Sequence, residues 1–515
     1  MKIIAALALG LVCAGAAQAD PCSGAAAGLY EGHAKSSDGM VLDITLNVRC
    51  DAGAYRVQFF TSAGDFTSTS ANFADSHLKL AFDTGAATGT ADLAQSGGNL
   101  SGSFVLADDK GAIDLVRRGN ALGADAMEPN LNLTPAQWRA DLQFLATELP
   151  KRHANAFFFI SKSTFDAEVA ALDARIDTAN GDEIFVGLQQ IVKSIGDGHT
   201  GVGTPPPDRR VMPIEIAHFD DDFRIAAVGP GLDAALGTRL QKIGDMPIAD
   251  AWQRVLTLTS QAELMALRQE DALVYLSRGY ALHGLDIVPD RNHAVYTLQD
   301  DSGRVFIEDV QGLAPDQTVA MKSGYSDSAL RFQKKDAPFS CKALPESDAV
   351  YCGWRSYQDL TANAKAMFAL VDRTHAKKLV IDMRDNGGGD NTVGYAALIK
   401  PIEARADLNR KGRLYVLIGP LTFSAAMNNA AQFADETNAI LAGETIGERP
   451  NSYQEPRQFR LPNSHLVIRA STLYYEFRKH GENAVRPDKE IVPTWDDVKA
   501  GRDPVMDWVL AQTAE

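Results

Sequence analysis

A chain of 515 residues is too long for a single hydrophobic core, so we expect two to four domains. Its hydrophobic content of 45% and charged content of 23% are those of an ordinary globular protein. The net charge of −16 argues against nucleic acid and anionic membrane surfaces as partners.

The first 19 residues carry the pattern of a secretory signal peptide. Lys2 precedes an apolar run over residues 3–12, and Ala17 and Ala19 mark a small-residue cleavage site before Asp20. The run is too short for a membrane anchor, and no later segment is long and apolar enough to span a bilayer. We therefore expect an exported protein, periplasmic or secreted, that lacks a membrane anchor.

Cleavage of the signal removes one cysteine and leaves four, an even number in an oxidising compartment. The expected disulfides are Cys22–Cys50 and Cys341–Cys352, because each pair falls within one local segment. The sequence contains no C-x-x-C or H-E-x-x-H motif, and its ten histidines are scattered. We therefore expect neither a metal nor an organic cofactor.

Residues 20–118 are predicted to form an all-β accessory domain. Short runs of alternating apolar and polar residues are separated by clusters of Gly, Asp, Asn and Ser, which is the pattern of strands and tight turns. Both a small barrel and a sandwich fit this pattern. The strands are expected over residues 42–48, 55–60, 78–82 and 100–106.

Residues 119–205 are predicted to be a linker followed by helices. Thr134 and Gln137 fit a capping box, so a helix begins there with an apolar stripe on one face. Another helix is expected over residues 182–195, ended by a glycine. A short polar loop, residues 197–200 (DGHT), follows it directly.

The remainder of the chain is expected to mix strands and helices. Residues 206–330 contain paired strands interrupted by a helical stretch. Over residues 331–515 strands alternate with helices, which predicts an α/β domain with much parallel sheet. The overall fold class is therefore multidomain α+β.

Ser424 is the first candidate catalytic residue. An apolar strand over residues 414–418 breaks at a Gly-Pro turn and restarts in alanines, so Ser424 would begin a helix. Unpaired N–H groups and the positive end of the helix dipole stabilise a negative oxygen there. The position suits a serine nucleophile, and it also suits a simple helix cap.

Residues 378–389 form a second motif, a buried strand that runs into three consecutive glycines. Gly387, Gly388 and Gly389 allow the backbone to approach a ligand closely, and they can expose N–H groups toward a reacting carbonyl oxygen. A plain strand-to-helix turn fits the same residues. The Lys-Ser/Thr pair of a phosphate-binding loop is missing.

His199 is the candidate general base. A serine nucleophile needs a base, and the first lysine after Ser424 is Lys479. The arginines in between cannot serve, because their guanidinium groups do not deprotonate usefully. His199 lies on a glycine-flanked loop just past a helix end, so it is the histidine that we expect to be recruited.

Four motifs together resemble the tricorn and C-terminal-processing family of serine peptidases, in order and rough spacing. They are residues 197–200 (DGHT), 382–389 (DMRDNGGG), 422–426 (TFSAA) and 443–447 (GETIG). The resemblance covers roughly residues 130–515. It implies a crotonase-like ββα catalytic domain over residues 331–515 and a PDZ-like remnant with a helical insertion in residues 206–330.

The resemblance also implies roles for individual residues. Ser424 would be the nucleophile and His199 the base. The oxyanion hole would combine the N–H of Ala425 with that of Gly387 or Gly388.

The chain departs from the family pattern at two positions. C-terminal-processing members carry a lysine shortly after the GETIG-like stretch, where this chain has Glu448 and Arg449, so it resembles the Ser-His type. Tricorn-like members carry an orienting serine before the histidine, where this chain has Gly198. They also use a late glutamate, for which Glu476 is the best match and Glu448 the alternative.

These observations predict an exported serine peptidase that acts on peptides or unfolded protein segments through an acyl-enzyme on Ser424. Two alternatives remain open from the sequence. One is a non-catalytic protein that binds apolar ligands on the same fold. The other is an esterase or amidase for small substrates.

Overall fold

The computed structural model describes residues 22, 26–37, 41–61, 64–203, 205–219, 222–326, 328–478 and 482–513. The predicted signal peptide lies outside these residues. Within them, no helix has the length and apolar character needed to cross a bilayer. The chain divides into two compact units, one ending at Glu128 and one beginning at Pro129.

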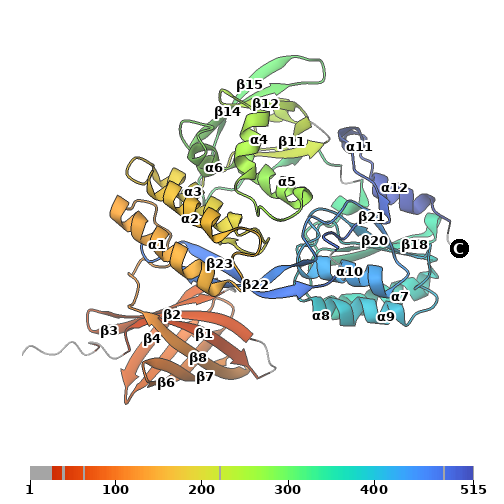
Figure 1. Cartoon of the computed structure of the whole chain (residues 1–515). Coiled ribbons are helices and arrows are strands. Elements are labelled where there is room, and N and C mark those ends of the chain that lie inside the picture. The colour runs from red at the N-terminus through yellow and green to blue at the C-terminus, as the bar shows by residue number, and fades with distance from the viewer. Residues whose placement is uncertain are drawn as a thin grey trace, which may run out of the picture. The chain divides into compact units, whose positions relative to one another are not determined.

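The first unit is a closed barrel of antiparallel strands, one of the two all-β forms that the sequence predicts (Figure 1). Each strand pairs with the next in the chain, and the first pairs with the last to close the barrel. Its strands are β1 (Gly28–Ser36), β2 (Val41–Asp51), β3 (Ala54–Thr61), β4 (Gly64–Ala74), β5 (His77–Asp83), β6 (Thr88–Ser96), β7 (Asn99–Leu106) and β8 (Asp109–Gly119).

Side chains fill the barrel interior. In β5, Leu78, Leu80 and Phe82 are buried while the residues at its two ends are exposed, as the two-residue period of a strand requires. The rings of Phe59 and Phe66 stack at 4.6 Å inside. The interior is therefore a packed core of the kind that small barrels form.

The second unit begins with three helices, and the first and last of them are those predicted above. The first starts after Thr134, whose side chain and that of Gln137 form the expected capping box. The last ends just before Gly196, which has a φ of 110° that favours glycine. These helices are α1 (Pro135–Arg152), α2 (Lys162–Asp173) and α3 (Gly181–Ser194).

An antiparallel sheet and three short helices follow. The sheet runs in the order β10-β11-β12-β14-β15, with β13 paired to β12 and β16 paired to β11. Its strands are β10 (Ile214–Phe219), β11 (Asp222–Val228), β12 (Arg239–Ile243), β13 (Met246–Pro247), β14 (His293–Gln299), β15 (Val305–Gln311) and β16 (Lys322–Ser323). The helices are α4 (Ile248–Leu256), α5 (Met265–Leu273) and α6 (Gly279–Gly284).

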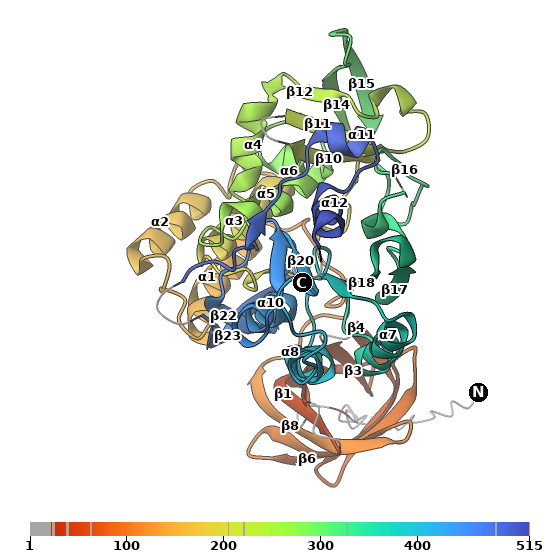
Figure 2. The same cartoon turned by 90° about the vertical axis from the view of Figure 1, so that its right-hand side faces the viewer.

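The last third of the chain is built on a six-stranded sheet, most of it parallel as expected. Helices α7 and α10 pack on one face and α12 on the other (Figure 2). The strands are β17 (Phe339–Leu344), β18 (Ala349–Trp354), β19 (Lys378–Asp382), β20 (Leu414–Ile418), β21 (Ile440–Gly443) and β24 (Lys489–Glu490). The helices are α7 (Leu360–Thr374), α8 (Asn391–Gly394), α9 (Lys400–Glu403), α10 (Ala425–Glu436), α11 (Trp495–Lys499) and α12 (Pro504–Ala511).

A C-terminal hairpin leaves this sheet and packs on the helical segment. Strands β22 (Asn451–Arg460) and β23 (Val467–Glu476) pair with each other, and β23 also pairs with β9 (Gly201–Val202). Phe459 and Ile468 of the hairpin share one core with residues of α1 and α3. The hairpin therefore ties the C-terminal third of the chain to the loop that follows α3.

Both expected disulfides are present. Cys22 is bonded to Cys50 of β2, and Cys341 of β17 is bonded to Cys352 of β18.

The Cys22–Cys50 bond should stabilise the barrel and leave the stability of the second unit unchanged. Replacing both cysteines by serine should lower its free energy of unfolding by about 3–4 kcal/mol, because the bond closes a long loop in the unfolded chain. All five tryptophans lie beyond residue 128, so their fluorescence reports only the second unit. Calorimetry should show a weakened transition, while the tryptophan midpoint stays unchanged. A loss below about 1 kcal/mol would contradict this prediction.

Candidate active site

Ser424 lies at a strained turn between β20 and α10. Its φ of 56° and ψ of −127° are unusual for a residue with a side chain, and such a conformation costs about 1–3 kcal/mol. The strand before it and the helix after it are both buried, so they hold the turn in place. Its side chain caps no N–H of α10. The simple helix-cap interpretation therefore does not describe this serine.

His199 contacts Ser424 directly. The imidazole Nε2 lies 3.0 Å from the Ser424 Oγ, although 225 residues separate them in the chain. The His199 ring also stacks on Phe423, with ring centroids 4.7 Å apart. At this distance Nε2 can accept the hydroxyl proton.

Glu448 lies on the Nδ1 side of the His199 imidazole. Its Oε1 is 3.5 Å from the His199 Nδ1, and its Oε2 accepts a short hydrogen bond from the backbone N–H of Ser424. Gln454 donates a further bond of 3.2 Å to Oε1. The residue is only 1% exposed. One buried carboxylate thus contacts both the serine and the histidine.

Glu476 occupies a different environment. It ends β23, where it pairs with Asn451, and its side chain is exposed. Of the two glutamates that the sequence offers as a third member, the structure brings Glu448 to the histidine.

The glycine loop after β19 lies against the start of α10. A Cβ built on Gly388 would come within 2.7 Å of the Ser424 Cβ and 3.1 Å of the Ala425 backbone N, so only glycine fits. The Gly388 N–H donates to the Asn386 side chain at 3.0 Å, and Gly387 is exposed. Ala425 is the first residue of α10, where N–H groups have no partner within the helix.

Asp197 fixes the loop that carries His199. One carboxylate oxygen accepts hydrogen bonds from the backbone N–H groups of His199 and Thr200 and from the Ser471 hydroxyl. The other accepts from His153 Nε2 at 2.9 Å. His153 Nδ1 accepts a hydrogen bond from the Asn155 N–H at 3.0 Å, which leaves Nε2 to donate to Asp197. Asp197 therefore binds the backbone of this loop and also joins the loop to the neighbouring strand β23.

Burial sets the protonation of the site. It lowers the pKa of His199 to about 4, so the imidazole is neutral and able to accept a proton at pH 7. Burial also raises the pKa of Glu448, and the nearby Glu263 carboxyl adds to this effect. Within the described ranges, no group of three or more His, Cys, Asp or Glu side chains is arranged to hold a metal ion.

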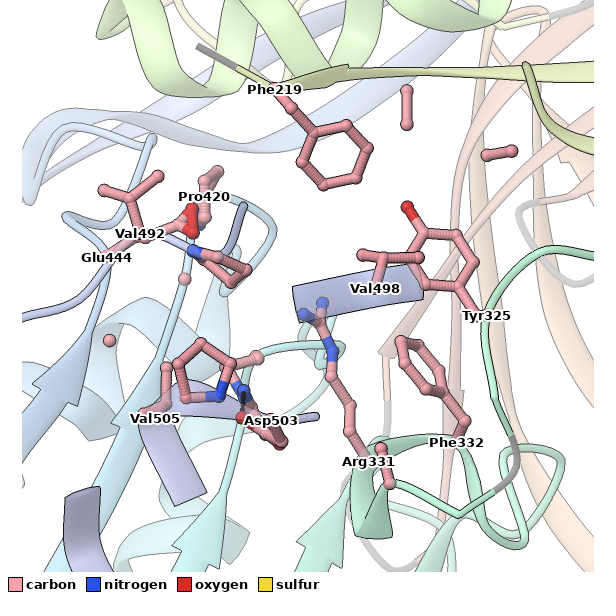
Figure 3. Close-up of a pocket in the computed structure, with 18 of the residues that line it drawn as sticks. Phe219, Tyr325, Arg331, Phe332, Pro420, Glu444, Val492, Val498, Asp503 and Val505 are labelled. Carbon is pink, nitrogen blue, oxygen red and sulfur yellow. Dashed lines mark hydrogen bonds and ion pairs between the residues drawn. The ribbon is translucent and has the colours of Figure 1, made fainter. Parts of the chain in front are cut away.

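A cavity of about 260 Å³ borders the segment that leads to Ser424. Figure 3 shows Phe219 on one side, Tyr325 and Phe332 on another, and Pro420 of the turn after β20. Arg331 on its wall is paired with Asp385 at 2.7 Å. A second cavity, of about 810 Å³, shares Leu421 with the first.

The sequence favours Glu476 over Glu448 and does not mark Asp197, His153 or Glu263 as contributors to the site. A signal for Glu448 exists, because it follows the GETIG motif directly in the sequence. Asp197 was visible only as part of the DGHT motif. His153 and Glu263 have no local signal, since their contacts are made entirely in the folded chain.

No known protein family matches the sequence, and no curated protein matches it. Among solved structures, mature CPAF complexed with lactacystin aligns with a TM-score of 0.54 and 12% identity, over 73% of this chain and 97% of that chain. The photosystem II D1 C-terminal processing protease (14% identity, 72% and 98% of the two chains) and the tricorn protease (11%, 91% and 45%) also match. Their TM-scores are lower, 0.34 and 0.33. The CPAF alignment shows a shared fold.

Asp197 should contribute strongly to stability. Burial opposes its ionisation, but hydrogen bonds from His153, Ser471 and Thr200 lower its pKa overall. Asp197→Ala leaves these buried donors unpaired and should cost about 3–5 kcal/mol of unfolding free energy at pH 7. This loss should shrink as the pH falls through the lowered pKa, because the carboxylate contributes only while ionised.

The measurement is urea unfolding followed by tryptophan fluorescence. Asp177→Ala is the matched control, since Asp177 pairs with Arg139 on the surface and is 65% exposed. It should leave the unfolding midpoint close to that of the wild type, because an exposed ion pair contributes little to stability. Equal losses for the two variants would contradict the structural role of Asp197.

Proposed function

We propose that the protein is a serine peptidase that cleaves peptides or unfolded protein segments outside the cytoplasm. The observation that carries the proposal is the 3.0 Å contact between Ser424 Oγ and a neutral His199, with Glu448 behind the imidazole. The fold that the chain shares with CPAF is consistent with this assignment.

The proposed reaction begins when His199 takes the Ser424 proton as the hydroxyl attacks the amide carbonyl. The resulting imidazolium is stabilised by Glu448, whose 3.5 Å separation from Nδ1 would shorten as charge develops. His199 then protonates the leaving amine. Water, activated by the same histidine, releases the acyl group from Ser424.

The negative oxygen of the tetrahedral intermediate would lie at the start of α10. The Ala425 N–H is one donor, and the N–H of Gly387 is the other, because the N–H of Gly388 already donates to Asn386. One such donor contributes about 3 kcal/mol to lowering the barrier. The close approach of Gly388 to Ser424 supports this arrangement, because it brings the loop backbone beside the nucleophile.

A peptide is the favoured substrate class because cavities of about 260 and 810 Å³ both border Leu421, three residues before the nucleophile. An extended chain can fill two such cavities with successive side chains, whereas a small ester needs only one.

The assignment is tested with a fluorophosphonate probe that reacts with activated serines. The wild type should be labelled at Ser424, Ser424→Ala should not be labelled, and His199→Ala should be labelled at least about 10²-fold more slowly because the base is lost. Peptide mapping by mass spectrometry locates the label. Normal labelling of the Ser424→Ala variant would end the proposal, and turnover of small esters without peptide cleavage would redirect it to an esterase.

The identity of the third member is tested by a matched pair of variants. Glu448→Gln should slow labelling by about 10²-fold or more, because the imidazolium loses its charge partner. Glu476→Gln should react at the wild-type rate, since its side chain is exposed at the end of β23. The reverse result would assign the role to Glu476.

A further inference from the structure

Glu263 connects the two loops of the candidate site. It lies just before α5 and is 5% exposed. Its Oε1 accepts the N–H of Gly198 at 2.9 Å, and its Oε2 accepts the N–H of Arg449 at 2.7 Å. Gly198 precedes His199, and Arg449 follows Glu448. One carboxyl group therefore bridges the neighbours of the base and of its carboxylate partner.

The backbone around Glu263 makes matching contacts. The Ala262 N–H donates to the carbonyl of Gly196 at 3.1 Å, and the Leu264 N–H donates to the carbonyl of Gly447 at 3.1 Å. The Arg449 side chain also donates to the carbonyl of Ala262. Residues 262–264 thus hold both loops through backbone and side chain together, which fixes their separation.

Gly198 leaves room for this contact. A Cβ on Gly198 would lie 2.9 Å from the Phe423 ring and 3.4 Å from the Glu263 Oε1. A side chain cannot be added there unless the ring that stacks on His199 moves. The bond from Glu263 to the Gly198 backbone therefore orients the histidine loop from a different part of the chain.

Glu263 also acts on Glu448 through its charge. Four charged groups interact with it: Glu448 and Asp197 are negative, and Lys193 and Arg449 are positive. Burial raises the pKa of Glu263 to about 7, and burial together with Glu263 raises that of Glu448. Two buried carboxyl groups that repel each other give up their protons in separate steps.

We propose that Glu263 is a positioning residue, which holds His199 and Glu448 in register by bridging the backbone N–H groups of Gly198 and Arg449, and whose buried charge acts on Glu448. The inference rests on the proposed peptidase function, because labelling of Ser424 is its readout.

Two variants separate the effect of the length of the Glu263 side chain from the effect of its charge. Glu263→Asp keeps the charge but is one methylene shorter, so it cannot reach both N–H groups. Its labelling should be about fivefold slower at every pH. The acid limb, which is the fall of the labelling rate toward low pH, should keep its midpoint. Glu263→Gln removes the charge that raises the pKa of Glu448. Its acid limb should move about one pH unit lower, toward the His199 pKa of about 4.

The experiment measures the fluorophosphonate labelling rate of the full chain from pH 4 to 8. Glu168→Gln is the matched control, because Glu168 of α2 is also a partly buried carboxyl group with a raised pKa. It should leave both the rate and the limb unchanged. Tryptophan fluorescence confirms that each variant is folded.

The inference would be overturned if the acid limb of Glu263→Gln had the same midpoint as that of the wild type. It would also be overturned if Glu263→Asp were labelled at the wild-type rate. A uniform loss of rate in Glu263→Gln without a shift of the limb would reduce Glu263 to a structural role and also count against it. If Glu263→Gln does not fold, the rate of Glu263→Asp decides. Failure of the wild type to be labelled at Ser424 is a different result, and it would refute the proposed function itself.

Discussion

The pairing of β23 with β9 is the constraint on which the candidate site depends. It brings the chain after residue 451 back onto the helical segment, next to the loop of His199. Asp197 then joins that loop to Ser471 of β23 and to His153 at the end of α1. Together with the bridge made by Glu263, the hairpin holds His199 beside a serine that lies 225 residues away in the chain.

The site concentrates buried charge. Asp197, Glu263 and Glu448 are each 5% exposed or less, and each accepts at least one hydrogen bond from a backbone N–H group of its own or a neighbouring loop. Burying a carboxylate is costly unless such donors surround it. The carboxylates therefore fix the loops, because a loop movement that left one of them without its donors would cost free energy of folding. The same burial keeps His199 neutral, so the arrangement that stabilises the fold also leaves this imidazole able to accept a proton.

The barrel and the second unit use different means to stay folded. The barrel closes its sheet on itself, fills the interior with side chains such as Phe59 and Leu78, and adds a disulfide. The second unit instead gathers segments from distant parts of the chain around shared cores. The site belongs entirely to this second unit.

The sequence by itself determined much of the local structure and offered Ser424 and His199 as candidate catalytic residues. Period-two alternation predicted the barrel strands, the capping box at Thr134 started α1, and the strand-turn-helix pattern put Ser424 at the start of α10. Only the tertiary structure decided between barrel and sandwich and between Glu448 and Glu476 as the residue beside His199. It also revealed Glu263 and His153. Local patterns follow from backbone geometry and short-range hydrogen bonds, whereas a partner hundreds of residues away is chosen by packing that no local pattern records.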